Sequence, residues 1–358
     1  MKTILIVLAI VLLLFAAAVL LFFFYFTGKP LYEPGIARRG EGLRSSLVPP
    51  AQSGDQSYWQ VENDIKLYHF SQGTGKNVLV VHGGPGYPIR KPWAGLEPLA
   101  GNYKFIYYDQ RGCGKSTRPI DRFSSPNFYA NMKTLDKVLG LGAQIADIER
   151  IRQILGEEKL VLIGHSFGGF LASLYAAEFP ERVKALVLVA PASVLVMPSK
   201  EGDMFEQVGN LLPGSLKNDY ADFRKRYFDF SHIFTKSEAD LAALNGEFPK
   251  YYGAALRARN STPPAGSGLN ENGGWMVFAM YMSMGKRHDY RPALSRVKAP
   301  VLVVHGELDL QPENLDRLYA ESFPNSSFEV IKGAGHFMYD EQPQAFSQIV
   351  GKFLNGLR

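Results

Sequence analysis

Short, nearly uninterrupted apolar runs alternate with helix-like segments along most of the chain. These runs have the length of strands and lack regular polar alternation, which is typical of strands buried on both faces of a parallel sheet. They are residues 77–83, 104–110, 159–165, 183–191 and 299–306. Between them, residues 142–155 and 170–179 have helical spacing, and residues 58–70 are expected to form a hairpin.

This alternation predicts an α/β fold, a mostly parallel twisted sheet with helices on both faces and right-handed crossovers. It stops at residues 193–292, which are helical, polar and rich in aromatic residues. Because a buried strand follows, we expect a helical cap inserted into a core made of residues 58–192 and 293–358. Most aromatic side chains of the cap should form its own small core, and a minority should face a pocket. Residues 28–57, rich in Gly, Pro, Ser and charge, are expected to be a tether.

The N-terminal segment contains no charged residue from position 3 to position 27. That length matches a helix that crosses a bilayer, and it exceeds the roughly 7–15 apolar residues of a signal peptide. We therefore predict a single-pass transmembrane helix, residues 1–27, that anchors the chain in a lipid bilayer, with a cleaved signal peptide as the alternative. Basic residues after the segment favour a cytoplasmic body. Its Lys-then-apolar opening instead resembles a bacterial export signal, and we predict a body outside the cytoplasm.

Charge and cysteine content exclude several function classes. The formal net charge is +5, and the densest basic run, residues 224–226, is flanked by acidic residues as on a solvated helix face. We therefore expect no nucleic-acid partner. Cys113 is the single cysteine, which excludes an internal disulfide and a cysteine-based metal cluster. Because the seven histidines are not clustered at ligand spacing either, we expect no metal and no other cofactor.

A serine flanked by glycines follows one of the predicted strands. Gly164, Ser166 and Gly168 spell G-x-S-x-G between a strand-like run and an alanine-rich helical run, which is the context of a nucleophile elbow. Such a turn holds the serine in a strained backbone, and a Cβ at either flanking position would collide with the strand or the helix. It also places the hydroxyl beside unpaired N–H groups at the start of the helix. Ser166 is therefore the candidate nucleophile.

Serine needs a base to remove its proton, and the later strands supply one. Asp309 and His336 each follow a predicted strand, so both should lie at the same edge of the sheet as Ser166. We predict that Asp309 orients His336, and that His336 deprotonates Ser166 and then protonates the leaving group. Glu307 is a rival for the acid role, but it lies closer to the end of its strand.

The negative charge that develops on a substrate carbonyl needs two preorganised N–H donors. One candidate is the backbone of Phe167, directly after the nucleophile. The second should come from the glycine-rich loop that follows an earlier strand, where Gly84 is our choice and Gly83 is the alternative. Pro85 should make this loop stiff.

Other polar residues near these motifs are expected to have structural roles. Residues 109–116 contain Gly-Lys-Ser, but Asp109 occupies the position at which a phosphate-binding loop requires glycine. We therefore reject ATP binding and expect Cys113 to be a packing residue. His165 and His305 are expected to pack against neighbours or to bond loops.

The motifs follow one another along the chain as HGGPG (82–86), DQRGCGKS (109–116), GHSFGG (164–169), HGELD (305–309) and GAGHF (333–337). Together they resemble the α/β-hydrolase superfamily over residues 58–358. The first two motifs are similar to those of the proline iminopeptidase branch of the serine aminopeptidases. This resemblance implies a cofactor-free hydrolase with a helical cap, in which acidic cap residues bind the free amine of a peptide. Glu247 and Glu271 are the candidates for that role.

Some features depart from that branch. Phe167 follows the serine where many members have tryptophan, a histidine before the serine is also usual in esterases and lipases, and residues 118–142 look longer than usual. We predict a membrane-anchored serine hydrolase with an acyl-enzyme at Ser166, which acts as an aminopeptidase and releases N-terminal residues from short peptides. The alternatives are a carboxylesterase, lactonase or lipase acting on small or lipid-derived esters, and a non-catalytic hydrolase-fold binding protein. The complete set of site residues argues against the last.

Overall fold

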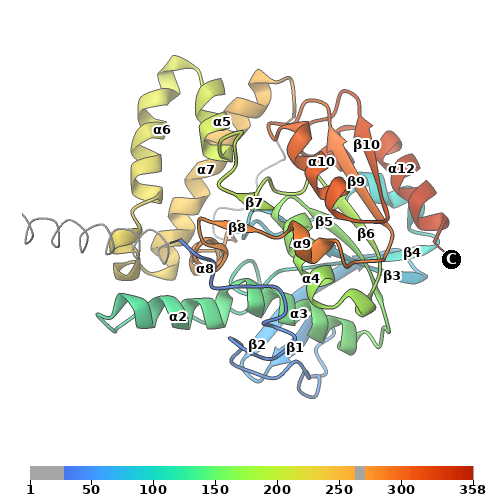
Figure 1. Cartoon of the computed structure of the whole chain (residues 1–358), viewed down its shortest axis with the longest axis horizontal. Coiled ribbons are helices and arrows are strands. Elements are labelled where there is room, and N and C mark those ends of the chain that lie inside the picture. Colours follow the sequence, from blue (N-terminus) through green and yellow to red (C-terminus); the bar gives the residue numbers. More distant parts are fainter. Residues whose placement is uncertain (1–27, 263–270, 358) are drawn as a thin grey trace, which may run out of the picture.

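An eight-stranded sheet forms the centre of the computed structural model, which describes residues 28–262 and 271–357 (Figure 1). The strand order is β1-β2-β4-β3-β5-β6-β9-β10, and the strands from β4 to β10 in that order pair in parallel. The bounds are β1 Tyr58–Glu62, β2 Ile65–Gln72, β3 Lys76–Val81, β4 Tyr103–Tyr108, β5 Leu160–His165, β6 Val183–Val189, β9 Val301–Gly306 and β10 Ser326–Ile331.

The predicted strands and the hairpin are present. Strands β5 and β9 are buried along their whole length, which explains why both are apolar runs without polar alternation. The two strands of the hairpin, β1 and β2, pair antiparallel, and β2 joins the sheet antiparallel to β4. The mostly parallel α/β architecture is therefore confirmed.

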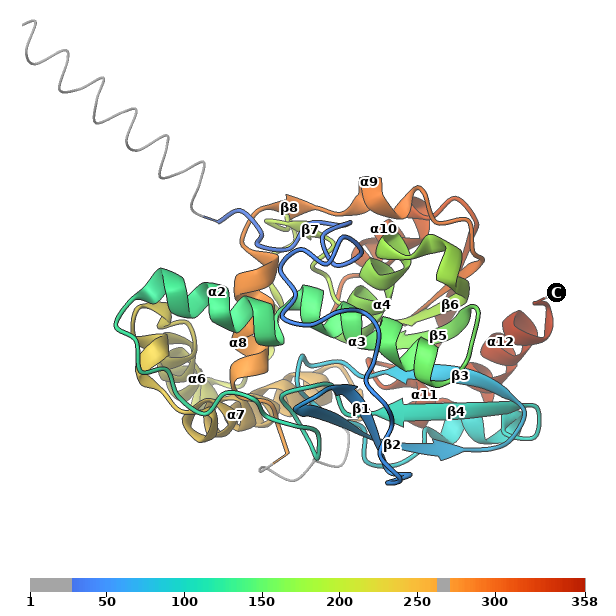
Figure 2. The same cartoon turned by 90° about the horizontal axis from the view of Figure 1, so that it is seen from below.

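Helices cover both faces of the sheet, and β3 illustrates the two layers. Leu79 and Val81 belong to an apolar cluster that includes side chains of α3 (Leu141–Ile154) and α4 (Phe167–Glu178); Figure 2 shows both helices on one side of the strands. Val78 and Val80 belong to a second cluster. This cluster also includes side chains of η1 (Ala94–Leu99), α11 (Met338–Glu341) and α12 (Pro343–Asn355). Helix α10 (Glu313–Ser322) packs against β9 and β10.

A largely helical insertion separates β6 from β9. It contains β7 (Val196–Met197), α5 (Met204–Leu211), α6 (Gly214–Tyr227), η3 (Phe230–Thr235), α7 (Glu238–Ala258), α8 (Trp275–Met284), β8 (His288–Asp289) and α9 (Arg291–Leu294). Helices α5, α6 and α7 gather at one end of the molecule (Figure 1). Their buried aromatic residues pack against one another, with ring centroids 5.2 Å apart for the tilted pair Phe223 and Tyr227. Helix α8 instead packs against α3 and α2 (Phe128–Leu139), part of the long segment at residues 118–142.

Residues 28–57, expected to be a tether, lie against the body. The side chain of Tyr32 is 1% exposed, and its hydroxyl donates to Glu178 at 3.0 Å. Further along the segment, Arg150 donates to the carbonyl oxygens of Ser45 and Ser46. These contacts use single side chains and backbone groups, which leave no periodic pattern in the sequence.

The predicted membrane anchor, residues 3–27, lies outside the described residues. Among the helices of residues 28–262 and 271–357, none has the length and apolar character that a membrane crossing requires.

Candidate active site

Ser166 lies at a sharp turn between β5 and α4, in a backbone conformation with φ 55° and ψ −123°. Such a conformation is strained for a residue with a side chain. Neighbouring glycines make the turn possible, because a Cβ on Gly164 would come within 2.5 Å of the Gly168 carbonyl oxygen, and one on Gly168 within 2.6 Å of the His82 carbonyl oxygen. The turn therefore has the geometry of a nucleophile elbow, with the half-buried Ser166 side chain at the first turn of a helix.

His336 and Asp309 meet beside the carboxyl ends of β10 and β9. Nδ1 of His336 lies 2.8 Å from Oδ2 of Asp309, and the two side chains are 5% and 0% exposed. The other carboxylate oxygen of Asp309 accepts the backbone N–H of Gln311 at 3.0 Å. These two predicted site residues, distant in the sequence, are therefore in direct contact.

The contact changes the pKa of both groups. Burial alone would raise the pKa of Asp309, but attraction to His336, their hydrogen bond and the Gln311 N–H together lower it below the ordinary value. Burial alone would lower the pKa of His336, but the charge and hydrogen bond of Asp309 raise it above the ordinary value. Asp309 therefore stabilises the protonated form of His336, which a base needs after it has taken a proton.

His165 connects the serine turn to the histidine loop. Its Nε2 lies 2.9 Å from the backbone oxygen of His336, and the two rings are 4.6 Å apart between centroids. Burial, followed by the nearby His336, lowers the pKa of His165 to about 3, so its neutral ring donates an N–H to that oxygen. Because His165 directly precedes Ser166, this hydrogen bond holds the backbone of His336 close to the serine turn. Within the described residues, the His336 ring is hydrogen-bonded to Asp309. In free enzymes the hydrogen bond between the base and the serine often forms only when substrate binds.

Glu307, the rival for the acid role, faces away from this contact. It is exposed, and its carboxylate accepts the backbone N–H of Gly333 at 2.8 Å. His305 also has its own partner, because its Nδ1 lies 2.8 Å from Oδ2 of the buried Asp316. The structure thus pairs His336 with Asp309 and keeps the neighbouring acid and histidine in separate contacts.

The loop proposed to supply an oxyanion donor lies directly against Ser166. A Cβ on Gly83 would come within 2.7 Å of the Ser166 Cβ and 3.3 Å of the Phe167 nitrogen. His82 stiffens this loop, since its Nε2 accepts the Gln110 N–H at 3.1 Å and its Nδ1 lies 3.0 Å from the Gly83 oxygen. Burial lowers the pKa of His82 to about 4, so the ring is neutral and can make both contacts. Gly83 is thus in close contact with the nucleophile, and Gly84 follows it directly in the chain.

Residues 109–116 form a closed loop around a buried carboxylate. Asp109 accepts the Lys115 N–H at 2.8 Å and two hydrogen bonds from Arg90. Cys113 is fully buried, and burial raises the pKa of its thiol well above the ordinary value, which makes it unreactive. Among residues 28–262 and 271–357 there is no group of three or more His, Cys, Asp or Glu side chains that could hold a metal ion.

Glu247, one of the two acidic candidates for amine binding, lies on the surface of the cap. Its two carboxylate oxygens accept from the two terminal nitrogens of Arg226 at 2.8 and 2.6 Å, and its side chain is 39% exposed. It borders a small depression of about 190 Å³ lined mostly by charged residues of the cap. The charge of Glu247 is therefore compensated by a partner of its own.

Glu271, the other acidic candidate, lies close to the glycine-rich loop beside Ser166. Two residues further on, the N–H of Gly273 donates to the Gly86 oxygen at 2.9 Å. The carboxylate of Glu271 forms an ion pair with Arg90, which also donates through both terminal nitrogens to Asp109. One guanidinium is thus shared between two carboxylates, and Glu271 is less fully compensated than Glu247.

Tyr252 on α7 is a neighbour of the site that the sequence did not single out. Its ring stands nearly perpendicular to that of His336, with the centroids 6.0 Å apart. Its hydroxyl is buried and has no hydrogen-bond partner within the described part of the chain. In the sequence it is one of many aromatic residues in the cap, and no local pattern separates it from those that form the cap core.

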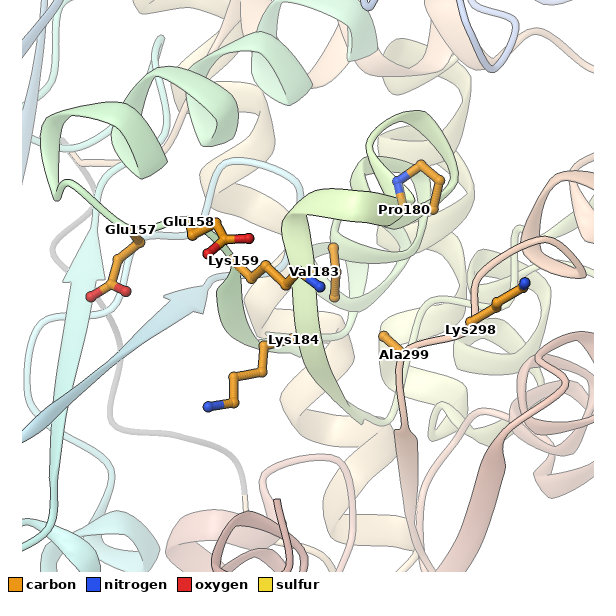
Figure 3. A pocket seen from close by; sticks show the side chains of 8 residues that line it. All are labelled: Glu157, Glu158, Lys159, Pro180, Val183, Lys184, Lys298 and Ala299. Carbon is orange, nitrogen blue, oxygen red and sulfur yellow. The ribbon is translucent and has the colours of Figure 1, made fainter. Parts of the chain in front are cut away.

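A larger depression, of about 620 Å³, lies at the opposite edge of the sheet (Figure 3). It is lined by Glu157, Glu158, Lys159, Pro180, Val183, Lys184, Lys298 and Ala299. These residues precede or begin β5, β6 and β9, whereas Ser166 and Asp309 follow β5 and β9. The depression is therefore separate from the predicted catalytic residues.

Comparisons with known proteins agree with the fold described above. A family profile for the alpha/beta hydrolase fold matches residues 76–343. The proline iminopeptidase of Heyndrickxia coagulans is 27% identical over 292 residues, which are 80% of this chain and 92% of that protein. The proline iminopeptidase of Saccharolobus solfataricus is 25% identical, over 81% of this chain and 88% of that protein.

Solved structures share the fold at lower identity. The proline iminopeptidase of Mycobacterium smegmatis superimposes with a TM-score of 0.52 at 20% identity, over 82% of this chain and 95% of that chain. A thermophilic esterase from Thermogutta terrifontis gives a TM-score of 0.52 at 23% identity, over 82% of this chain and 94% of that chain.

Proposed function

Because the chain belongs to the alpha/beta hydrolase fold family, we propose that it is a serine hydrolase with Ser166 as the nucleophile, His336 as the base and Asp309 as the acid. The observation that carries this proposal is the 2.8 Å contact between His336 and Asp309 beside the strained turn of Ser166. A structural histidine could pair with a carboxylate anywhere in the fold. Here the pair lies at the sheet edge where a nucleophile elbow also ends.

The reaction follows from the roles of these three residues. His336 takes the proton of the Ser166 hydroxyl as Oγ attacks the substrate carbonyl, and the carbonyl oxygen becomes an oxyanion. The N–H groups of Phe167 and Gly84, with Gly83 as the alternative, stabilise that charge. His336 then gives its proton to the leaving group, and an acyl-enzyme forms. A water molecule loses a proton to His336, attacks the acyl carbon and releases the acid, and the proton returns to Oγ.

The proposed substrates are short peptides or amino-acid amides with a free amine, cleaved from the N-terminus as in a proline iminopeptidase. The curated relatives named proline iminopeptidase support this reading. Glu271 supports it as well, because its carboxylate lies in the cap close to the loop beside Ser166 and shares its partner Arg90 with Asp109. Glu271 and Asp109 share one positive charge, that of Arg90. A substrate ammonium group could add a second positive charge beside these two carboxylates.

A second candidate is a carboxylesterase, lactonase or lipase. The observation that favours it is the ion pair of Glu271 with Arg90, since a substrate without an amine would leave this pair intact. Turnover of aminoacyl anilides, including the proline anilide, should be compared with turnover of p-nitrophenyl esters. Rapid ester hydrolysis without any anilide hydrolysis would eliminate the aminopeptidase and leave the esterase.

The proposed nucleophile can be tested without a known substrate. A fluorophosphonate probe should label the folded full-length chain, and Ser166→Ala should abolish the labelling. The absence of labelling in folded wild-type protein would instead support the non-catalytic binding protein.

Glu271 and Glu247 form a matched pair for testing amine recognition. Glu271→Gln should raise KM for aminoacyl anilides about 10- to 100-fold, because the negative charge that pairs with the substrate ammonium group is lost, and it should leave KM for p-nitrophenyl esters unchanged. Glu247→Gln is the control and should leave both values unchanged. An equal effect of the two variants would contradict amine binding by Glu271.

Membrane attachment through residues 3–27 is a proposal from the sequence alone. The full chain should stay with membranes after alkaline carbonate washing, and deletion of residues 1–30 should release active protein. Release of the full chain by the same wash would rule out an uncleaved anchor.

A further inference from the structure

The carboxylate of Glu341 joins two segments that are far apart in the sequence. One oxygen accepts the backbone N–H of Gly335, the residue before His336. The other accepts the Ser261 hydroxyl at 2.7 Å and the Thr262 N–H at 3.2 Å. Ser261 follows α7 of the cap, and its own N–H donates to the Leu256 oxygen inside that helix at 3.0 Å. One side chain therefore holds the histidine loop and the end of a cap helix together.

The two segments are also in direct contact beside Glu341. Ser261 is 5% exposed, and a Cβ on Gly335 would come within 2.7 Å of the Ser261 Cβ. A glycine at position 335 is thus required by the close approach of the cap rather than by the turn alone. Any displacement of Ser261 would change the packing of the residue before His336.

A second contact from the same helix reaches the His336 ring itself. Tyr252, on α7, stands nearly perpendicular to that ring, with 6.0 Å between the centroids. On the other side, His165 donates to the His336 backbone oxygen. The histidine is therefore held by the core through Asp309 and His165, and by the cap through Tyr252 and the Glu341 contacts.

We propose that Glu341 is a positioning residue that couples the cap to the catalytic base: it holds Gly335 and Ser261 at once, so that His336 is correctly placed only while the end of α7 is docked. This inference rests on the catalytic role proposed for His336. Its consequence is that the base is fully assembled with the cap closed over the site, which limits unproductive chemistry in an open site.

Because Glu341 is charged, the proposal predicts a shift of the pH profile, which a purely structural role would not produce. The titratable groups near His336 are Asp309 after β9, Asp316 from α10, Glu341 from α11, Tyr252 from α7 and the neutral His165 from β5. Burial lowers the pKa of His336, whereas Asp309, Asp316 and Glu341 raise it. Removing the Glu341 charge should therefore lower the pKa of His336 and move the acid limb of the pH profile to lower pH.

The experiment compares Glu341→Gln, Ser261→Ala and Glu307→Gln in the full-length chain. Glu307 is the matched control, because its carboxylate also accepts an N–H from the same loop, at Gly333, but has no recorded contact with the described part of the cap. The readout is the second-order rate constant of fluorophosphonate labelling at Ser166 between pH 5 and 9, with thermal unfolding to establish folding. We expect Glu341→Gln to slow labelling about 10- to 100-fold, since a misplaced catalytic group costs about that much, and to shift the acid limb downward.

The other variants separate the two halves of the proposal. Ser261→Ala should slow labelling less than Glu341→Gln and leave the acid limb in place, and Glu307→Gln should match wild type. A wild-type rate in Ser261→Ala would overturn the coupling to the cap, and this variant decides the question if Glu341→Gln fails to fold. Wild-type rate and pH profile in folded Glu341→Gln would overturn the positioning role while leaving the proposed triad intact. If wild-type protein is not labelled at all, the proposed function itself fails, and this inference fails with it.

Discussion

Two buried histidine–aspartate pairs in this fold share the same contact distance but differ in their surroundings. In both pairs Nδ1 of the histidine lies 2.8 Å from Oδ2 of the aspartate, for His336 with Asp309 and for His305 with Asp316. His336 lies on a loop beside the serine turn, where His165 holds its backbone. His305 lies within β9, and its ring stacks against Phe328 of β10 with the centroids 6.3 Å apart. A buried pair of this kind is therefore not sufficient to make a base.

The aspartates of the two pairs differ in how their second oxygen is used. Oδ1 of Asp309 accepts the Gln311 N–H, and this bond, after the charge of His336, helps to overcome burial and lower the pKa of Asp309. Oδ1 of Asp316 is buried without a hydrogen-bond partner in the described residues, and burial raises the pKa of Asp316 to about 7. The charged form of Asp309 is therefore favoured, whereas burial makes the charged form of Asp316 less favourable. Each aspartate nevertheless raises the pKa of its histidine against the effect of burial, so the two pairs differ in the carboxylate rather than in the ring.

Removing the reacting side chains should have the largest effect on this comparison. Ser166→Ala or His336→Ala should each lower kcat about 10⁴- to 10⁶-fold, because the nucleophile and the base act as a unit. His305→Ala should change kcat by less than about tenfold, since its ring has no part in proton transfer. Steady-state kinetics on the best substrate, with circular dichroism to check folding, would test this. A loss in His305→Ala as large as in His336→Ala would make the two pairs equivalent and contradict the assignment.

Replacing each aspartate by asparagine should give the next largest difference. Asp309→Asn should lower kcat about 10⁴-fold, because the amide favours the wrong tautomer of His336 and cannot stabilise its charge. Asp316→Asn should have a much smaller effect, since Asp316 contacts His305 and not the proposed base. The ratio of the two kcat values is the measurement, and a ratio near one would remove the distinction between the two carboxylates.

The pH profile should separate the pairs by a smaller but directional effect. The pKa of His336 is raised above its ordinary value of 6.5, and the base must be neutral to act. The acid limb of kcat/KM should therefore lie above pH 6.5, with activity rising as pH increases through it. Asp309→Asn should move the limb to lower pH, and Asp316→Asn should move it the same way by less. An unmoved limb in Asp309→Asn would mean that another group controls it.

Stability should show the smallest effect, and here the pair that should matter is His305 with Asp316. His305→Ala leaves the buried Asp316 without its hydrogen-bond partner and should lower the free energy of unfolding by about 1–3 kcal/mol. His305→Gln, which retains a side-chain N–H donor, is the matched control and should lose less. Urea unfolding of the variants would measure both values. Unchanged stability in His305→Ala would show that water or a neighbour satisfies Asp316.

Much of the fold could be predicted because its cause is local. The apolar runs at β5 and β9 are strands buried on both faces, and burial on both faces excludes polar alternation within the strand itself. The turn at Ser166 was predictable for a similar reason, since Gly164 leaves space for the nearby Gly168 carbonyl oxygen within the same turn. Asp309 and His336 could be placed at one sheet edge because parallel strands end at the same side.

The remaining features depend on contacts between residues that are distant in the sequence. Glu307 and Asp309 are nearly adjacent in the chain, yet one bonds the Gly333 amide and the other bonds His336. The segment 28–57 looks like a linker by composition, but Tyr32 is buried against Glu178. Glu341 has no local pattern that separates it from a surface residue, and its contacts span 80 residues to Ser261. Spacing encodes steric and burial constraints within one element, whereas the choice among nearby charged groups is made only when separate elements pack together.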